Sequence, residues 1–346
     1  MAITDVTIYG AGIFGLSIAW ECLGRGARVQ VIDPNGPGAG ASGGLVGALA
    51  PHTPERWEEK KQFQLDSLLM AADFWANIET ASGLPSSYKR AGRVLPLANE
   101  RGFALAQART EDAKILWQDH ARWQVLTTNP HPGWVPESPV NSWVFDTLSA
   151  RMSPRMAGAA LAAAIVARGG SIARDGTPRG AVIWATGVAG LADLSDAFGS
   201  EMGNGQKGQS ALLDHDARDL PQVFAEGVHI IPHADGRTAI GSTSERYYTS
   251  PNSVDEQLED LLERARGLCP DLRKAKVLER WAGLRPRSKT RAPMLGAWPG
   301  REGHFIANGG FKIGFGMAPK VAEVMADLVL NIADKIPADF RVEANL

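Results

Sequence analysis

The stretch VTIYGAGIFGLSIAWECLGRGARVQVID, residues 6–33, decides the fold class of this chain. Its start belongs to a short run at residues 3–9 that is rich in Ile, Val and Tyr. Glycines interrupt this run, apolar residues then return at helical spacing as far as Gly24 and Gly26, and ARVQVID follows with the pattern of a second strand. This order predicts a β-α-β unit, and β-α-β units build parallel sheets.

Three glycines between the first strand and the helix form the pattern G-x-G-x-x-G. Gly10 permits a tight turn, Gly12 lets a pyrophosphate approach the backbone, and Gly15 lets the helix pack closely on the strand. The N–H groups and the positive end of the helix favour phosphate charge. Asp33 closes the second strand, where a carboxylate accepts hydrogen bonds from ribose hydroxyls and disfavours the 2′-phosphate of NADP. The unit predicts a nucleotide site, but NAD and FAD both stay open because each carries an ADP half.

The composition is typical of a globular enzyme. The chain has 346 residues, 44% of them hydrophobic and 21% charged, and this length suggests roughly two domains. A net charge of −2 gives no electrostatic footprint for nucleic acid or anionic lipid. No apolar run reaches the roughly 18 residues of a membrane-spanning helix, and Met1 leads into a strand without the features of a secretory signal. We therefore expect a cytoplasmic protein that is not inserted in a membrane and does not bind nucleic acid.

Cys22 and Cys269 are the only two cysteines, and neither belongs to a CxxC or Cys/His spacing. This usage fits a reducing compartment and predicts two ordinary buried or semi-buried residues. The seven histidines form no HExxH or HxH pair, so no metal site is predicted. The absence of a G-x-S-x-G elbow excludes a Ser-His-Asp hydrolase of that type.

The rest of the chain alternates between helical patterns and glycine-rich segments. Four further helices are indicated by apolar spacing or capping signals: residues 62–79, a helix capped by Ser153, one opened by a capping box from Ser253 to Glu256, and residues 320–335. Two β runs flank Asp235 and Gly236, which is a hairpin signal. Residues 85–146 carry many aromatics and prolines, and we expect irregular structure there within a different subdomain.

Seven segments, in order along the chain, resemble the D-amino-acid oxidase family of FAD-dependent oxidoreductases, most closely its glycine oxidase and sarcosine oxidase-like members. The segments are YGAGIFG, ASGGLVGALAPH, IWATGV, KGQ at residues 207–209, AIGSTSE, WAGLRPRS and GGFKIGFGMAP. The resemblance implies an α/β plus α+β fold in which a Rossmann-like FAD-binding domain is interleaved with an antiparallel-sheet substrate domain. We expect the FAD domain at 1–84, 147–215 and 276–346, and the substrate domain at 85–146 and 216–275.

The resemblance also implies which residues contact FAD. Binding should be non-covalent because neither cysteine lies in a flavin-facing motif. The glycine-rich segment from Gly310 to Gly316 lies, in the family, near the pyrimidine edge of the flavin, where N–H groups stabilise the charge of the reduced ring. This segment and the first glycine turn are expected to converge on one flavin ring. The implied contact residues are Gly10, Gly12, Ile13, Phe14, Gly15, Asp33, Ala41, Ser42, Val46, Gly47, Ala48, Ala185, Thr186, Gly187, Gly310, Phe311, Lys312, Ile313, Gly314 and Phe315.

The chemistry that the resemblance implies needs a group that binds the substrate carboxylate. A planar guanidinium can do so through two parallel charge-assisted hydrogen bonds. Arg285 in GLRP falls at the family's carboxylate-binding arginine and is the candidate, with Arg287 as a substitute. The competing interpretation of Arg285 is a structural arginine that bonds loop carbonyls. Lys312 stands where glycine oxidases carry a second arginine, so it either offers one more positive charge or is a solvated lysine.

Several positions depart from the glycine oxidase pattern. His229 replaces a tyrosine near the substrate, and Gly310 and Ile313 replace His and Asn in the flavin loop, which implies a larger or less polar pocket. His52 is either a further pocket residue or a loop histidine that is only hydrogen-bonded. Residues 173–180 are too short for the strand pair that covers the adenine in the family.

The implied reaction is oxidation of the C–N bond of a small amino acid or secondary amine by hydride transfer to flavin N5. The product is an imine, which water hydrolyses to an oxo acid. Oxygen or another electron acceptor then reoxidises the flavin. Two alternatives stay open, a flavin-binding subunit without turnover of its own and an NAD-dependent dehydrogenase.

Overall fold

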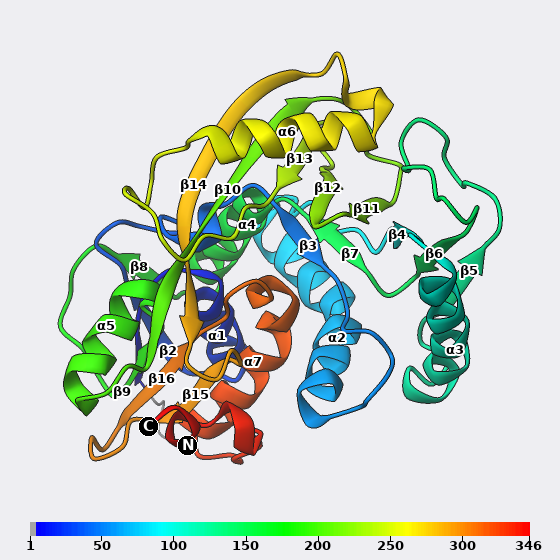
Figure 1. Ribbon diagram of the computed structural model, residues 1–346. Coiled ribbons are helices and arrows are strands. Elements are labelled where there is room, and N and C mark those ends of the chain that lie inside the picture. Colours follow the sequence, from blue (N-terminus) through cyan, green and yellow to red (C-terminus); the bar gives the residue numbers. More distant parts are fainter. Residues whose placement is uncertain (1–4) are drawn as a thin grey trace.

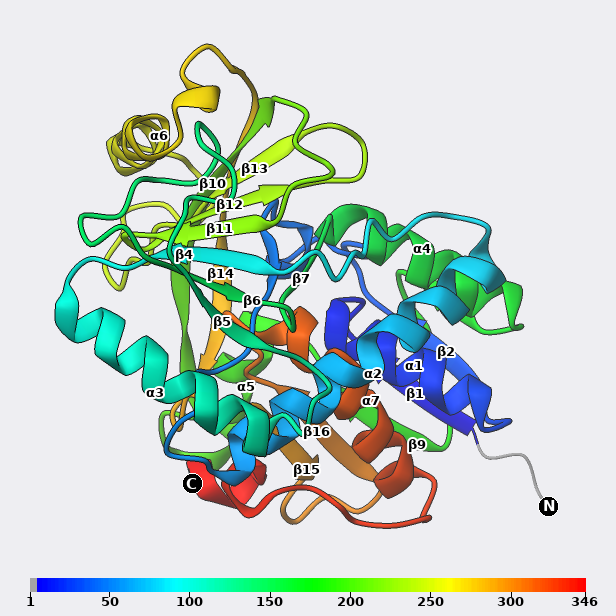
Figure 2. The same cartoon turned by 90° about the vertical axis from the view of Figure 1, so that its right-hand side faces the viewer.

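The computed structural model describes residues 5–346 and contains two large sheets (Figures 1 and 2). In spatial order the six-stranded sheet comprises β15 (Met294–Ala297), β16 (His304–Asn308), β9 (Ala181–Trp184), β1 (Asp5–Tyr9), β2 (Arg28–Ile32) and β8 (Ser171–Ala173). The eight-stranded sheet comprises β14 (Lys276–Ser288), β10 (Gly203–Asp214), β13 (Thr238–Gly241), β12 (Val228–Pro232), β11 (Gln222–Ala225), β4 (Arg93–Pro96), β6 (Trp143–Asp146) and β5 (Trp123–Leu126). The predicted fold class is confirmed, and the predicted domain boundaries stay a prediction.

The six-stranded sheet grows from the β-α-β unit at the start of the chain. β1 pairs in parallel with β2 on one side and with β9 on the other, and β16 continues the parallel set beyond β9. Only β15 runs antiparallel in this sheet. The predicted unit is confirmed for the described residues, whereas residues 3 and 4 lie outside them. Five neighbouring strands, β16, β9, β1, β2 and β8, therefore end at the same edge of the sheet.

Four helices pack together beside this sheet: α1 (Ile13–Gly24), α2 (Glu59–Ser82), α4 (Pro154–Ala167) and α7 (Gly314–Val329) (Figure 2). Ile18, Leu68 and Val321, one from each of three of them, are almost completely buried in one apolar core. Each such side chain contributes about 1.5–3 kcal/mol through burial. The packing of α1 against α7 joins the two ends of the chain.

The eight-stranded sheet is antiparallel except for the pair β4 and β11. Helix α6 (Glu256–Leu268) lies across it (Figure 1) and buries the stripe Leu258, Leu261, Leu262 and Ala265. The predicted hairpin is confirmed, since β12 and β13 pair as far as Pro232 and Thr238. The long strands β10 and β14 run on together toward helix α5 (Gly187–Phe198), and so link this sheet with the parallel sheet (Figure 1).

The expectation of irregular structure at 85–146 is wrong. The segment contains helix α3 (Glu100–Leu116) as well as strands β4, β5 and β6. Helix α3 has no apolar stripe, because Ala106 and Ala113 are its only buried residues. Its clearest local signal is the cap, where Asn99 Oδ1 accepts a hydrogen bond from the N–H of Gly102 at 2.9 Å.

Several predicted helix ends are also corrected. The capping box from Ser253 to Glu256 is not formed, since Asp255 is the N-cap and accepts a hydrogen bond from the N–H of Gln257 at 3.1 Å. Ser153 does occupy the N-cap of α4, but its side chain makes no capping bond. Helix α7 begins at Gly314, inside the segment that was expected to be a glycine-rich loop.

The remaining short elements complete the chain: β3 (Gly47–Leu49), β7 (Ala150–Met152), and the 3-10 turns η1 (Ala41–Gly43), η2 (Pro270–Leu272), η3 (Ala338–Phe340) and η4 (Val342–Asn345). Cys22 and Cys269 are both buried, and burial raises the pKa of each thiol to about 12. Across residues 5–346, no helix combines the length and the apolar character needed to cross a bilayer.

Candidate active site

The first glycine turn lies at the carboxyl end of β1. Gly10 has a φ of +102°, and a Cβ there would overlap the carbonyl of Ala185 after β9. A Cβ at Gly15 would overlap the carbonyl of Gly10. A Cβ at Gly12 would meet nothing closer than Ser42 Oγ, at 3.3 Å. Gly10 and Gly15 are therefore required by the packing of the chain, whereas Gly12 leaves an open approach to the start of α1.

Two side chains from later in the sequence reach this turn. Asp33 Oδ2 accepts a hydrogen bond from the N–H of Ala11 at 2.8 Å, and Oδ1 accepts one from the N–H of Asn35 at 2.9 Å. Ser42 Oγ accepts a hydrogen bond from the N–H of Ile13 at 2.9 Å. Each carboxylate oxygen of Asp33 can accept a second bond, so this residue still suits a ribose hydroxyl.

A second glycine-rich segment, residues 309–316, meets the first. A Cβ at Gly310 would lie 3.0 Å from Cζ of Phe14, and one at Gly314 would lie 3.5 Å from Cγ2 of Ile13. The start of α7 thus lies against the start of α1, as the packing of the two helices also indicates. The two glycine-rich segments converge as the sequence predicts.

The other residues implied to contact the cofactor lie near the same edge. Residues 185–187 follow β9, and the side-chain amide of Asn308, at the end of β16, donates to the carbonyl of Gly187 at 2.9 Å. Val46 precedes β3, which contains residues 47 and 48 and packs against α7, and Val46 Cγ2 lies 2.5 Å from the position of a Cβ at Gly241 in β13 of the eight-stranded sheet. The carboxyl ends of parallel strands are where ligands bind in open α/β sheets. This edge therefore holds the segments that the sequence assigned to one cofactor.

Arg285 lies on β14, and its guanidinium is held by backbone. Nη1 donates to the carbonyl of Thr243 at 3.2 Å and to that of Lys207 at 3.4 Å. Burial lowers the pKa of Arg285 to about 10, with only the negative charge of Glu245 acting in the opposite direction. Arg285 bonds carbonyls, as the structural interpretation requires. It also keeps further N–H donors and a poorly compensated charge, as the binding interpretation requires.

The positive charge of Arg285 affects the pKa values of Lys312 and His229. Burial lowers the pKa of Lys312, and the positive charge of Arg285 lowers it further. Burial also lowers the pKa of His229 to about 3, with smaller effects from Arg93, Lys312 and Arg285. The His229 ring lies 4.4 Å from the ring of Phe224, centroid to centroid, a neighbour that the sequence does not predict. A neutral imidazole therefore stands near three cationic side chains.

Arg287 has different surroundings. Its guanidinium carbon lies 6.0 Å from the centroid of the Phe311 ring. Burial lowers the pKa of Arg287, and the charges that lower it further are Arg291 and Arg246. It lines an open pocket of about 230 Å³ with Glu201, Gly203, Asn204, Ser288 and Lys289. These neighbours favour Arg285 over Arg287 as the carboxylate anchor.

His52 is held by one neighbour. Gln64 Oε1 lies 2.7 Å from the backbone N of His52, which donates to it, and 2.5 Å from the ring Nδ1. Gln64 Nε2 in turn donates to the carbonyl of Ala50 at 3.3 Å, and burial lowers the pKa of His52. These contacts are those of a hydrogen-bonded loop histidine, and a role in the pocket stays a prediction.

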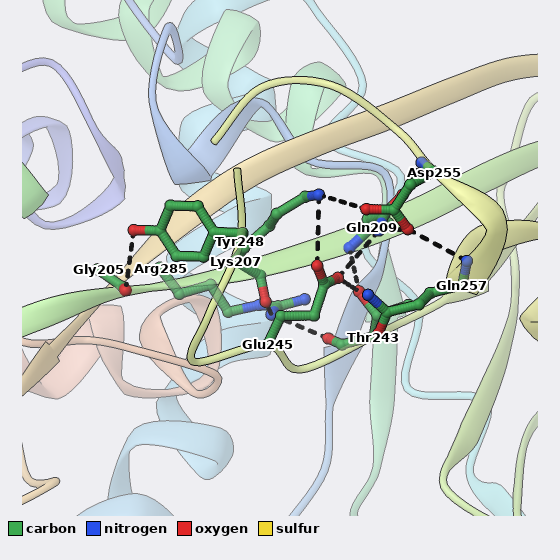
Figure 3. Close-up of polar contacts among 9 residues, drawn as sticks. All are labelled: Gly205, Lys207, Gln209, Thr243, Glu245, Tyr248, Asp255, Gln257 and Arg285. Atoms are coloured by element: carbon green, nitrogen blue, oxygen red, sulfur yellow. Dashed lines mark hydrogen bonds and ion pairs between the residues drawn. The ribbon is translucent and has the colours of Figure 1, made fainter. Parts of the chain in front are cut away.

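A buried polar network behind Arg285 is the main feature that the sequence does not predict (Figure 3). Lys207 Nζ lies 2.8 Å from Asp255 Oδ2 and 3.3 Å from Glu245 Oε2. Gln209 Nε2 donates to the same two carboxylates. The segments KGQ and AIGSTSE contain three of these residues, but only the fold brings them together.

Two further sequence expectations concern what is missing. The chain passes from Ala173 at the end of β8 to Ala181 at the start of β9 without another strand, so the shortened adenine segment is as the sequence predicts. Among residues 5–346, no cluster of three or more His, Cys, Asp and Glu side chains has a geometry that would hold a metal ion.

Comparisons with known proteins identify similar sequences and a similar fold. The family model described as DAO, FAD dependent oxidoreductase, matches residues 5–328. The chain is 25% identical to glycine oxidase from Geobacillus kaustophilus, over 94% of this chain and 92% of that protein. It is 37% identical to glycine oxidase from Pseudomonas aeruginosa over 36% of this chain and 34% of the relative. The crystal structure of glycine oxidase from Geobacillus kaustophilus has a TM-score of 0.84 at 22% identity and 99% coverage of both chains.

The residues at this edge fit a dinucleotide with a planar ring. Gly12 is the N-cap of α1 and brings no side chain of its own, so apart from the N–H of Ile13, which bonds Ser42 Oγ, the positive end of α1 can face a phosphate. Phe311 has a φ of +43°, and its N–H donates to the carbonyl of Pro286 at 3.0 Å, which fixes the second segment against the end of β14. Arg285 lies one residue before Pro286. The cofactor edge and the cationic group are therefore connected through a single strand end.

Proposed function

Since this chain belongs to the DAO family of FAD-dependent oxidoreductases, we propose that it oxidises the C–N bond of a small amino acid or secondary amine. The substrate would lose a hydride from Cα and a proton from nitrogen, and the resulting imine would add water to give an oxo acid and an amine or ammonia. Membership of this family decides the cofactor in favour of FAD and against NAD. It also favours an enzyme over a flavin-binding subunit without turnover.

When bound, FAD supplies the hydride acceptor, and the protein's task is to place the substrate against it. The open face of Gly12 and the start of α1 suit the pyrophosphate, and Asp33 suits the ribose. The N–H groups at the start of α7, around Gly314, suit the negative charge of the reduced ring. Residues 41–48 and 310–315 are proposed to contact the cofactor in the manner that the family resemblance implies.

The observation that carries the substrate assignment is the half-buried guanidinium of Arg285, which the carbonyls of Lys207 and Thr243 hold over Gly208. Its charge is poorly compensated, because burial outweighs the effect of Glu245 on its pKa. A substrate carboxylate would restore the missing negative charge and accept two parallel hydrogen bonds. Lys312 adds a second positive charge to the same place. Together these charges select an amino acid over a simple amine.

His229 is proposed to line the substrate side of this group. A histidine with a pKa near 3 is neutral at physiological pH, so it does not add a third positive charge. A neutral imidazole can accept a hydrogen bond from the substrate amine. It therefore takes over the polar contact of the family's tyrosine with a smaller side chain.

The proposed function is tested by anaerobic mixing of the FAD-loaded protein with glycine, sarcosine and a set of D-amino acids. We expect at least one of them to bleach the visible band of the oxidised flavin, and we expect the corresponding amine without a carboxylate to be much slower. Readmission of air then tests whether oxygen serves as the acceptor. A flavin that no amino acid reduces would contradict the proposal.

A further inference from the structure

Gly208, at the centre of β10, leaves room for the guanidinium of Arg285. A Cβ placed on Gly208 would overlap Nη1, Nη2 and Cζ of Arg285. The guanidinium therefore lies directly over the backbone of β10 at this residue. Any side chain larger than hydrogen at Gly208 would fill that space.

Two carbonyls hold the guanidinium in this position. They belong to Lys207, the neighbour of Gly208 in β10, and to Thr243, in the segment that follows β13. This segment runs antiparallel to β10, because Lys207 and Glu245 exchange backbone hydrogen bonds of 3.1 and 2.9 Å. The position of Arg285 thus depends on the alignment of residues 243–245 with β10.

Side chains on the opposite face of β10 fix that alignment. Successive residues of a strand point to opposite faces, so Lys207 and Gln209 point away from the face that Arg285 occupies over Gly208. Lys207 Nζ pairs with Asp255 at 2.8 Å and with Glu245 at 3.3 Å. Gln209 Nε2 donates to Glu245 at 3.0 Å and to Asp255 at 2.7 Å (Figure 3).

The centre of this network is buried, whereas the Asp255 side chain at its edge is 40% exposed. The Lys207 side chain is 2% exposed and that of Glu245 is 5% exposed. Burial lowers the pKa of Lys207, but hydrogen bonds to Asp255 and Glu245 together raise it above its usual value. The ammonium therefore stays charged. Loss of Lys207 would leave the buried Glu245 carboxylate without a cation at high cost, whereas loss of Glu245 would leave Lys207 paired with Asp255 alone.

We propose that Lys207, Gly208, Gln209, Glu245 and Asp255 are positioning residues that form a seat for the carboxylate-binding guanidinium of Arg285. Gly208 provides the space for the guanidinium, and the four polar side chains fix the two carbonyls that orient it. This inference rests on the proposed function, in which Arg285 binds the substrate carboxylate. It adds that the strength of this binding is set by residues that touch neither substrate nor cofactor.

The first test is Gly208→Ala in the FAD-loaded enzyme. The obstacle to the new methyl group is the end of a flexible side chain, so we expect Arg285 to move while the strand stays folded. The Kd for acetate, measured from the change it causes in the flavin absorption spectrum, should rise about tenfold, the effect of losing one good charge-assisted hydrogen bond. The FAD content and Tm should change little. A Kd within twofold of the wild-type value would overturn the seat.

Gly267→Ala is the matched control. Gly267 lies in α6, and a Cβ there has nothing within 4 Å. We expect no change in the Kd for acetate. If the wild-type enzyme itself binds no acetate, the proposed function fails together with the seat. If the wild type binds and Gly208→Ala binds equally well, only the seat fails.

The second test weakens the polar network on the opposite face of β10. We expect Glu245→Gln to raise KM for the amino-acid substrate about tenfold with kcat changed less than threefold, because Arg285 orients the substrate before the chemistry. Glu259→Gln, which breaks the exposed pair of Glu259 with Arg280 at 2.8 Å, should leave both constants unchanged. Should Glu245→Gln fail to fold, the double variant Lys207→Met/Glu245→Met removes both buried charges and is expected to fold with the same rise in KM. An unchanged KM in a folded variant of either kind would contradict the claim that this polar network positions Arg285.

Chemical rescue tests the space over Gly208 independently of the Arg285 side chain. We expect millimolar guanidinium to restore part of the activity that Arg285→Ala loses, because the empty seat binds the free cation. The double variant Gly208→Ala/Arg285→Ala should show no rescue, since the new methyl group fills the seat. Equal rescue of both variants would overturn the assignment of Gly208, and full activity of Arg285→Ala without any addition would instead contradict the proposed function.

Discussion

The proposed cofactor edge and the proposed substrate anchor of this enzyme are built in different ways. Glycines and backbone N–H groups form the cofactor edge, where Gly10 and Gly15 let chain segments approach without side chains. Charged and polar side chains form the proposed anchor, where the carbonyls of Lys207 and Thr243 hold Arg285 and the side chain of Lys207 pairs with Asp255. The cofactor edge should be disrupted by side-chain atoms added at its glycines. The anchor should be disrupted by the loss of hydrogen-bond or ion-pair partners. The two regions should therefore respond to opposite kinds of substitution.

The largest effect is expected from Gly15→Ala. Its Cβ would overlap the carbonyl of Gly10, which belongs to the backbone and cannot move away cheaply. We expect a loss of about 3 kcal/mol or more in the free energy of unfolding, together with loss of bound FAD, measured by denaturant titration and flavin absorbance. Gly26→Ala is the control, because Gly26 has a φ of +84° but open space around it. It should cost only about 1–2 kcal/mol and leave FAD bound.

The next largest effect is expected from Arg285→Met. The substitution keeps an unbranched side chain in place but removes the donors for a carboxylate. We expect kcat/KM to fall roughly 100-fold, which corresponds to about 3 kcal/mol of charge-assisted hydrogen bonding. The FAD content should stay at the wild-type level, because the cofactor edge does not depend on this charge. A variant that loses FAD as readily as Gly15→Ala would contradict the separation of the two regions.

The third effect concerns stability at mildly acid pH. His229 and His233 have pKa values lowered by burial to about 3 and about 4, so the folded state keeps both rings neutral where the unfolded state protonates them. Stability is complete above the unfolded value of about 6.5 and falls as the pH drops below it, by about 1.4 kcal/mol per pH unit for each histidine. His229→Phe should remove one of these contributions. Denaturant titrations between about pH 6 and pH 5 would measure the change in slope, and an unchanged slope would contradict a neutral buried His229.

The smallest effect is expected from Arg287→Met. Arg287 lies on the same strand as Arg285, but its charged neighbours are Arg291 and Arg246 and it lines an open pocket. We expect kcat/KM to change less than about threefold, as for most exposed charges. A loss as large as that of Arg285→Met would mean that the anchor extends along β14 beyond the residues proposed here.

The comparison also explains what the sequence could predict. The glycine turn, Asp33 and the first β-α-β unit follow from local spacing, because each role is set by neighbours within one supersecondary unit. Helix α3 does not, since it buries only Ala106 and Ala113 and so lacks an apolar stripe. Helix α7 begins within a glycine-rich segment because packing against α1 overrides low helix propensity.

The network behind Arg285 shows a second limit of sequence reasoning. Ser253 has the spacing of a capping box, yet Asp255 caps α6 because Lys207 and Gln209 hold its side chain from a distant strand. The segments KGQ and AIGSTSE carry part of the family resemblance, but the resemblance gave them no role. Only the pairing of β10 with the chain after β13 unites them.

The most direct measurement is a crystal structure of the enzyme with FAD and a bound carboxylate such as acetate. We expect the flavin ring between residues 46–48 and the segment around Gly310, with the carboxylate within hydrogen-bond distance of Arg285. Gly208 should still lie beneath the guanidinium. A flavin that faces a separate cavity, or a carboxylate bound away from Arg285, would contradict the central claim that both glycine-rich segments and this arginine serve one reaction.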